Sequence, residues 1–82
     1  MEFIKGTPMV SQRGPGGKYY YAGTKNEAYI NPSAIASAVY DSNENMTAIV
    51  MIGAGGSAIF KGDVMREYEE RVRRQAGDGR DD

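Results

Sequence analysis

The chain has 82 residues and a formal net charge of −1, and it contains neither cysteine nor histidine. A chain of this length suits one small domain, because only roughly 60% of the unfolded surface is buried when about 60 residues fold. Without cysteine and histidine, disulfide bonds and the usual ligands of zinc and iron–sulfur clusters are excluded. The near-neutral charge gives no global field to concentrate nucleic acid. The composition therefore favours an intracellular, cytoplasmic protein with no cofactor.

The N-terminal third is predicted to hold two short strands and a loop. Residues 2–5 form an opening strand that ends at Pro8, because proline cannot donate to a strand ladder. Residues 9–11 could resume this strand. Residues 11–18 contain three glycines and one proline, and so permissive a backbone predicts a flexible loop.

Three consecutive tyrosines mark the next strand, which is predicted over residues 18–22. Successive side chains of a strand point to opposite faces, so Tyr20 lies on one face and Tyr19 with Tyr21 on the other. One of these faces should be partly exposed. After a turn, residues 27–30 are predicted to pair with the tyrosine strand as a hairpin.

Residues 33–40 follow an Asn-Pro break and carry a mixed signal. Their alanines favour a helix, whereas Ile35, Val39 and Tyr40 with small residues between them allow a strand. We expect a short turn that leads into a strand. A polar turn over residues 41–45 then connects to the next element.

Residues 46–61 give the strongest strand signal in the chain. An apolar run, a glycine-rich break and a second apolar run predict a buried β-hairpin. The first run is apolar on both faces, with two alternating sets of side chains: Met46, Ala48, Val50 and Ile52 against Ile49 and Met51. A strand of this kind needs cover on both faces, from another element of the chain or from a second copy.

A helix is predicted from Asp63 to about Gln75. Asp63 is the candidate N-cap, and Gly77 is the expected stop. An apolar stripe at helical spacing should cover the sheet: Val64, Met65, Tyr68 and Val72. The opposite side offers three ion pairs in the favourable Glu-first order: Glu67–Arg71, Glu69–Arg73 and Glu70–Arg74.

These elements predict an α+β fold. We expect a small, strongly bent antiparallel sheet of about four to six strands, which could close toward an open barrel, with one C-terminal α-helix packed on it. Residues 1–76 would form a single domain with the flexible loop at 11–18, and residues 77–82 would form a disordered tail.

The basic loop and the tyrosine strand form the candidate site. Flexible basic residues beside stackable rings suit either a protein hot spot or a platform for single-stranded nucleic acid. The partner-binding residues are predicted to be Arg13, Lys18, Tyr19, Tyr21 and Lys25. A structural alternative is a disordered loop beside a strand whose tyrosines pack on the core. The sequence therefore favours a small noncatalytic regulatory or inhibitory protein that binds a protein partner or self-associates as a homodimer, with a nucleic-acid-binding regulator as the alternative.

Catalysis and membrane insertion have little support in the residues. The chain has no histidine or cysteine to act as a general base or nucleophile, so Ser37 and Ser57 lack the usual activating partner. We therefore expect no enzyme. Residues 53–56 fit a hairpin turn better than a phosphate loop, because Ser57 opens a strand and not a helix. No apolar run reaches the roughly 18 residues that a membrane span needs, so no membrane partner is expected.

Residues 29–73 carry a family resemblance. The order Tyr29-Ile30-Asn31-Pro32, a strand, a glycine turn and the entry Lys61-Gly62-Asp63-Val64 into a Glu-rich helix resembles the small FlbD-like flagellar and swarming-motility proteins. The resemblance implies a compact sheet-plus-helix fold and a role in motility. The chain departs from the family in its insertion at 11–18 and in Asp63, where the family often has serine. Its size also suits a virus-encoded inhibitor, which the residues do not separate from a cellular adaptor.

Overall fold

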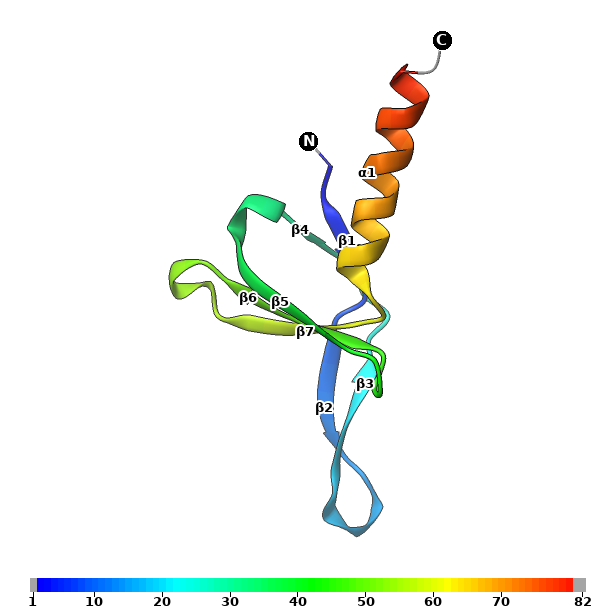
Figure 1. The fold of residues 1–82 in the computed structure, drawn as a ribbon. Coiled ribbons are helices and arrows are strands. Elements are labelled where there is room, and N and C mark those ends of the chain that lie inside the picture. The colour runs from blue at the N-terminus through cyan, green and yellow to red at the C-terminus, as the bar shows by residue number, and fades with distance from the viewer. Residues whose placement is uncertain (1, 81–82) are drawn as a thin grey trace.

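The computed structural model describes residues 2–80, without the side chains of Ala54 and residues 77–80. Within this range the chain forms seven strands and one α-helix (Figure 1). The strands are β1 (Ile4–Gly6), β2 (Met9–Arg13), β3 (Tyr19–Gly23), β4 (Ala28–Ile30), β5 (Ile35–Asp41), β6 (Met46–Met51) and β7 (Ser57–Lys61), and the helix is α1 (Val64–Arg80). The predicted α+β class with a C-terminal helix is confirmed. The strands form three small antiparallel sheets that do not close into a barrel.

The strand pairing differs from the predicted one in the N-terminal half. The tyrosine strand β3 pairs with β2, placing Arg13 opposite Tyr19 and Met9 opposite Gly23. Strand β4 pairs with β1 instead. The predicted hairpin between the tyrosine strand and residues 27–30 is therefore wrong. The segment after Gly23 leads the chain away from β3 and back to the opening strand.

The loop predicted at residues 11–18 is shorter than expected. Strand β2 continues to Arg13, and the turn is closed by the Gly14 amide, which donates to the Lys18 carbonyl at 2.7 Å. Gly16 and Gly17 have φ values of 78° and 80°, which favour glycine. The glycines thus build a tight reversal at the end of a two-stranded hairpin, which we call the arm (residues 9–23).

Residues 31–61 follow the sequence prediction closely. A short 3₁₀ turn at Pro32–Ala34 leads into β5, so residues 33–40 are a turn and a strand. The Asn31 side chain stabilises this turn by accepting from the Ser33 amide at 3.0 Å. Strands β6 and β7 form the predicted central hairpin, and β5, β6 and β7 make one three-stranded sheet.

The core lies where the three-stranded sheet meets β1, β4 and the first turn of α1. Its buried apolar side chains are Ile4, Ile30, Ile49, Phe60 and Val64. Thr47 is also fully buried, and its hydroxyl joins the sheet to the start of the helix. The Thr47 Oγ1 donates to the Gly62 carbonyl at 2.6 Å and accepts from the Val64 amide at 3.3 Å. This small core and its polar link are called the junction below.

The helix begins as predicted but makes different ion pairs. The Asp63 Oδ1 accepts from the Arg66 amide at 3.2 Å, which confirms the N-cap. Of the predicted stripe, Val64 is buried and Met65 and Tyr68 pack against the core, whereas Val72 is exposed. The assigned helix continues beyond Gly77 to Arg80.

The predicted Glu-first pairs on α1 are wrong. Among the described side chains, the ion pairs are Arg66–Glu70 at 3.4 Å and Arg71–Glu2 at 2.8 Å. The first has the reverse order along the helix, and the second joins the helix to the N-terminal segment. Arg71 thus takes a tertiary partner in place of Glu67.

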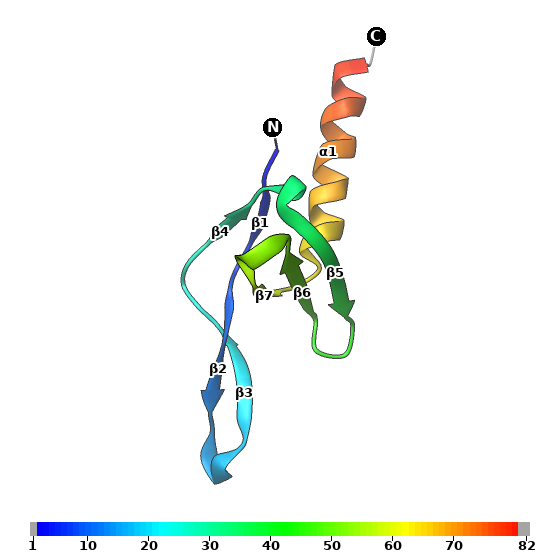
Figure 2. The ribbon, with the colours of Figure 1, turned by 90° about the vertical axis from the view of Figure 1, so that its left-hand side faces the viewer.

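The molecule is extended. The arm and α1 point to opposite ends, and the three-stranded sheet projects to the side (Figure 1, Figure 2). The radius of gyration is 15.0 Å, whereas a compact domain of this length has about 12 Å. The accessible surface is 5944 Å², compared with about 4,800 Å² for a folded monomer of this mass.

Candidate functional site: a groove between the arm and the sheet

The two faces of the three-stranded sheet have different surroundings. Thr47 and Ile49 of β6 and Phe60 of β7 point to the inner face and are buried in the junction. The alternate positions form an outer face without such cover: Val39, Asp41, Met46, Ala48, Val50 and Ile59. The sequence predicted that both faces of the central strand need cover, and within the described residues only the inner face is covered by core side chains.

Cross-strand pairing brings the outer-face side chains together. Ala48 stands opposite Val39 on one side and opposite Ile59 on the other. The small Ala48 side chain therefore lies between two branched ones at the centre of the face. Val39, on the edge strand β5, is 64% exposed, so most of this apolar side chain faces water.

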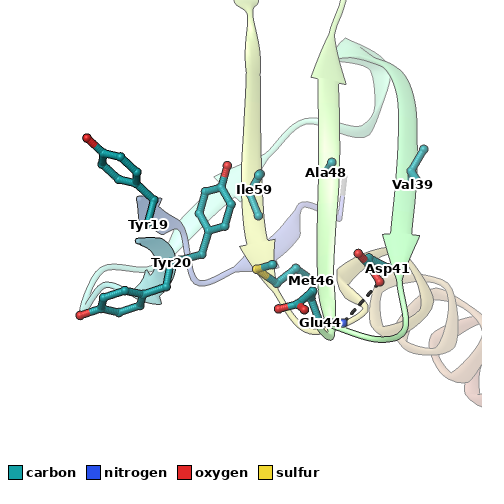
Figure 3. Close-up of a pocket in the computed structure, with 9 residues that line it drawn as sticks. Tyr19, Tyr20, Val39, Asp41, Glu44, Met46, Ala48 and Ile59 are labelled. Carbon is teal, nitrogen blue, oxygen red and sulfur yellow. Dashed lines mark hydrogen bonds between the residues drawn. The ribbon is translucent and has the colours of Figure 1, made fainter. Parts of the chain in front are cut away.

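The tyrosines of the arm form the second wall of a groove beside this face (Figure 3). The groove has a volume of about 560 Å³ and is lined by Tyr19, Tyr20, Tyr21, Val39, Asp41, Glu44, Met46, Ala48 and Ile59. The base of the arm is held by Pro8, which bridges to Phe60 of β7. The arm therefore leaves the body at the edge of the sheet and borders the outer face.

One end of the groove is acidic. Asp41 is the last residue of β5, and Glu44 lies in the turn that leads to β6 (Figure 3). The Asp41 Oδ1 accepts from the amides of Asn43 at 2.9 Å and Glu44 at 3.3 Å, so its carboxylate is held in place by the turn. None of the nine lining side chains is basic. The groove therefore combines apolar and aromatic walls with a negative end.

The predicted site residues are only partly brought together. Tyr19 and Tyr21 line the groove as expected. Arg13 and Lys18 flank the turn at the tip of the arm, whereas Lys25 follows the end of β3 at its base. Five paired residues at about 3.3 Å each separate the two ends. Arg13 and Lys18 therefore lie beside Tyr19 at the tip, whereas Lys25 does not join them.

Most of the residues that line the groove were not among the site residues predicted from the sequence. The prediction left Tyr20 out of the site, although the ring lines the groove and its hydroxyl donates to Gln12 Oε1 at 3.1 Å. It also did not assign Val39, Met46, Ala48 or Ile59 to a site. The signal that could have found them was the apolar alternation of the central strand, which predicted a second apolar face in need of cover.

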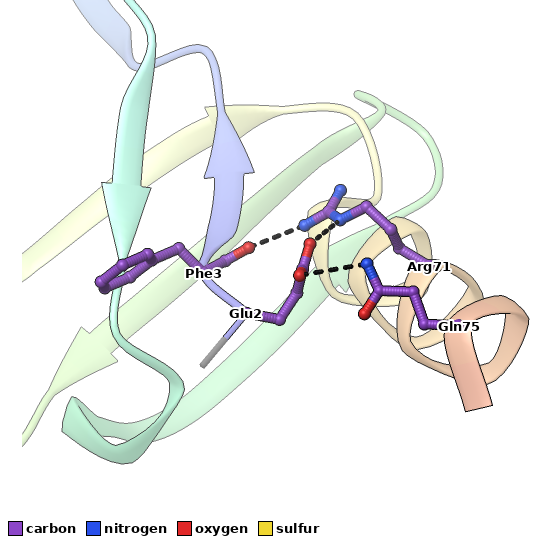
Figure 4. Close-up of polar contacts among 4 residues, drawn as sticks. All are labelled: Glu2, Phe3, Arg71 and Gln75. Atoms are coloured by element: carbon purple, nitrogen blue, oxygen red, sulfur yellow. Dashed lines mark hydrogen bonds and ion pairs between the residues drawn. The ribbon is translucent and has the colours of Figure 1, made fainter. Parts of the chain in front are cut away.

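A polar cluster fastens the N-terminal segment to α1 and is separate from the groove (Figure 4). Arg71 donates from Nε to the Glu2 carboxylate at 2.8 Å and through its terminal nitrogen to the Phe3 carbonyl at 2.7 Å. Gln75 donates to the same carboxylate at 3.3 Å. The hydrogen bond from Arg71, followed by that from Gln75, lowers the pKa of Glu2 from its ordinary value. These contacts have a structural role.

The described residues contain no group of histidine, cysteine, aspartate or glutamate side chains that could hold a metal ion. In the same part of the chain, no helix has the length and apolar character needed to cross a membrane. No protein-family model, curated protein or solved structure matches the sequence. The resemblance of residues 29–73 to FlbD-like proteins stays a prediction.

Proposed function

We propose that the protein is a noncatalytic interaction module that binds a protein segment in the groove between the arm and the outer face. The observation that carries the proposal is the groove itself. Two elements of the chain each present apolar side chains to the same space, and nothing else in the described residues fills it.

The composition of the groove suits protein contact. Tyrosine provides a large, rigid contact area and is enriched at interface hot spots. Tyr19 is 71% exposed, so a partner that covers it would remove much of its ring from water. Full burial of a side chain such as Val39 is worth about 1.5–3 kcal/mol. A few such contacts would supply most of the free energy of a moderate complex.

The proposal can be tested with a double variant, Tyr19→Ala with Tyr21→Ala, and a matched control, Tyr29→Ala. Tyr29 is also exposed but lies on β4, outside the residues that line the groove. Each tagged protein is used for affinity capture from lysate, and every captured protein is then purified and titrated against all three baits. We expect direct binding to the wild type and the control, and loss of binding to the double variant. Equal binding to all three baits would contradict the proposal.

A small nucleic-acid-binding regulator is the second candidate. It is favoured by Arg13 and Lys18 beside the exposed ring of Tyr19 at the tip of the arm. The carboxylates of Asp41 and Glu44 would repel phosphate groups at the other wall of the groove. Labelled single-stranded RNA and DNA, titrated at low salt, test this candidate. Absence of binding there would exclude it, because phosphate contacts are strongest under those conditions.

A further inference from the structure

The arm has too few packing contacts to be stable by itself. No residue of β2 or β3 is buried, and the two strands pair only with each other. An isolated two-stranded hairpin is marginally stable in water, and three or more strands or a packed face are normally required. The arm therefore needs a surface to lie against.

The outer face of the three-stranded sheet is apolar and lacks cover from the described residues. Ala48, at the apolar centre of this face, lies between Val39 and Ile59. An aromatic ring could therefore pack on the small alanine side chain, with a branched side chain on each side of the ring. The arm carries such rings at Tyr19 and Tyr21, on one face of a strand. One chain thus presents both the rings and an apolar surface with a small residue at its centre.

The chain exposes more surface than a compact monomer of its mass, and the excess is comparable in size to a dimer interface. The accessible surface exceeds that of a typical folded monomer by about 1,100 Å². The protruding end of α1 accounts for part of this surplus. A standard interface buries about 800 Å² on each partner. Association of two copies through the arm and the outer face would therefore bring the exposed surface to the usual range.

The charges also fit a second copy of the chain. The tip of the arm is basic, with Arg13 and Lys18, and the turn at the end of the groove is acidic, with Asp41 and Glu44. Among the described side chains, ion pairs join other residues, and none of these four takes part in one. Both charged groups are exposed and of opposite sign.

We propose that the chain forms a symmetric homodimer by reciprocal exchange of arms. This inference rests on the proposed function and names the protein segment that occupies the groove. The arm of each copy lies in the groove of the other, with its tyrosines on the outer face and its basic tip beside Asp41 and Glu44 of the other copy. A two-fold axis makes the two contacts identical, which gives a closed dimer and no fibre.

The test uses charge reversal at two exposed positions that make no hydrogen bond through their side chains in the described structure, Lys18→Glu and Glu44→Lys. Sedimentation velocity at about 50 mM salt, where screening is weak, measures the dimer dissociation constant. We expect a wild-type dimer and a dissociation constant raised roughly tenfold or more by either single change, because each like-charge contact occurs twice. The matched control is Lys25→Glu at the base of the arm, which should leave the dissociation constant within about twofold.

The decisive step is an equimolar mixture of the two single variants. In a mixed dimer, the arm that carries Lys18→Glu would lie beside the acidic turn that carries Glu44→Lys, so opposite charges would meet again. The second contact of the same dimer would be the wild-type pair. We therefore expect the mixture to dimerise with nearly wild-type affinity, although each component alone is weakened. Rescue only when both changes are in the same chain would show an intramolecular contact and overturn the proposal.

Two other results would overturn the inference. One is a wild-type monomer at protein concentrations up to about 100 μM, where even a weak specific dimer is populated. The other is a dimer that neither Lys18→Glu nor Glu44→Lys weakens. In both cases the proposed function survives if the Tyr19→Ala and Tyr21→Ala variant still loses its captured partner, and it fails if that variant binds like the wild type.

Discussion

The junction and the arm differ in how they treat large apolar and aromatic side chains: the junction buries them, and the arm exposes them. In the junction, Ile4 and Ile49 are fully buried, and the hydroxyl of Thr47 satisfies both the end of β7 and the start of α1. In the arm, three consecutive tyrosines are exposed, and neither strand has a buried residue. The folding free energy should therefore be concentrated in the junction, while the arm and the outer face are free to contribute to binding.

The largest effect is expected from Ile49→Ala at the centre of the junction. Removing a fully buried isoleucine side chain to alanine costs about 2–5 kcal/mol, a large part of the stability of so small a core. The matched change Val50→Ala affects the next residue of the same strand, on the outer face. It should cost less than about 1 kcal/mol in folding. Urea denaturation followed by circular dichroism measures both, and equal losses would remove the distinction between the two faces.

The next effect is expected from Thr47→Val, which keeps the shape of the side chain and removes its hydroxyl. The Gly62 carbonyl and the Val64 amide then lose a partner inside the junction, at a cost of about 1–3 kcal/mol. Thr47→Ser is the control, since it retains the hydroxyl. A valine variant as stable as the wild type in urea would show that the hydroxyl does not link sheet and helix.

A smaller effect is expected from Asp63→Ala at the start of α1. The change removes the acceptor for the Arg66 amide, and loss of an N-cap typically costs about 1 kcal/mol. Asp63→Asn preserves an acceptor and should be close to the wild type. Thermal unfolding distinguishes the two, and equal losses in both variants would point to charge instead of capping.

The smallest effect concerns pH and the cluster at Glu2. Because the folded-state pKa of Glu2 lies below its ordinary value of 4.5, the Arg71 contact stabilises the fold above that pH. The stabilisation is lost as the pH falls through the lowered pKa. Glu2→Gln should therefore lower the melting temperature at pH 7 and have no effect well below pH 4.5. Glu69→Gln, on the exposed side of α1, is the control; a wild-type melting temperature for Glu2→Gln at pH 7 would contradict the assignment.

Local signals allowed part of this fold to be predicted. The glycine break between β6 and β7, the Asn-Pro turn before β5 and the Asp63 cap each act over a few residues. Such features depend on backbone preferences and short-range hydrogen bonds, which the sequence displays directly.

Contacts distant in the sequence could not be predicted. Glu2 and Arg71 are 69 residues apart, and no periodic pattern relates them. The glycines between Arg13 and Lys18 fit a flexible loop or a tight hairpin turn equally well, and the choice decided which strand the tyrosines pair with. The outer face could be foreseen as apolar, but its neighbour could not, because that depends on where the arm leaves the body.

The most direct measurement of the central claim is disulfide trapping between two chains. The protein has no cysteine, so Lys18→Cys in one chain and Glu44→Cys in a second, size-tagged chain give a unique heterologous cross-link. If the arm of one copy lies in the groove of the other, this cross-link should form rapidly under mild oxidation and far faster than one made with Lys25→Cys, because a disulfide requires Cα atoms within about 7 Å. Equal, slow rates for both pairs would contradict the account.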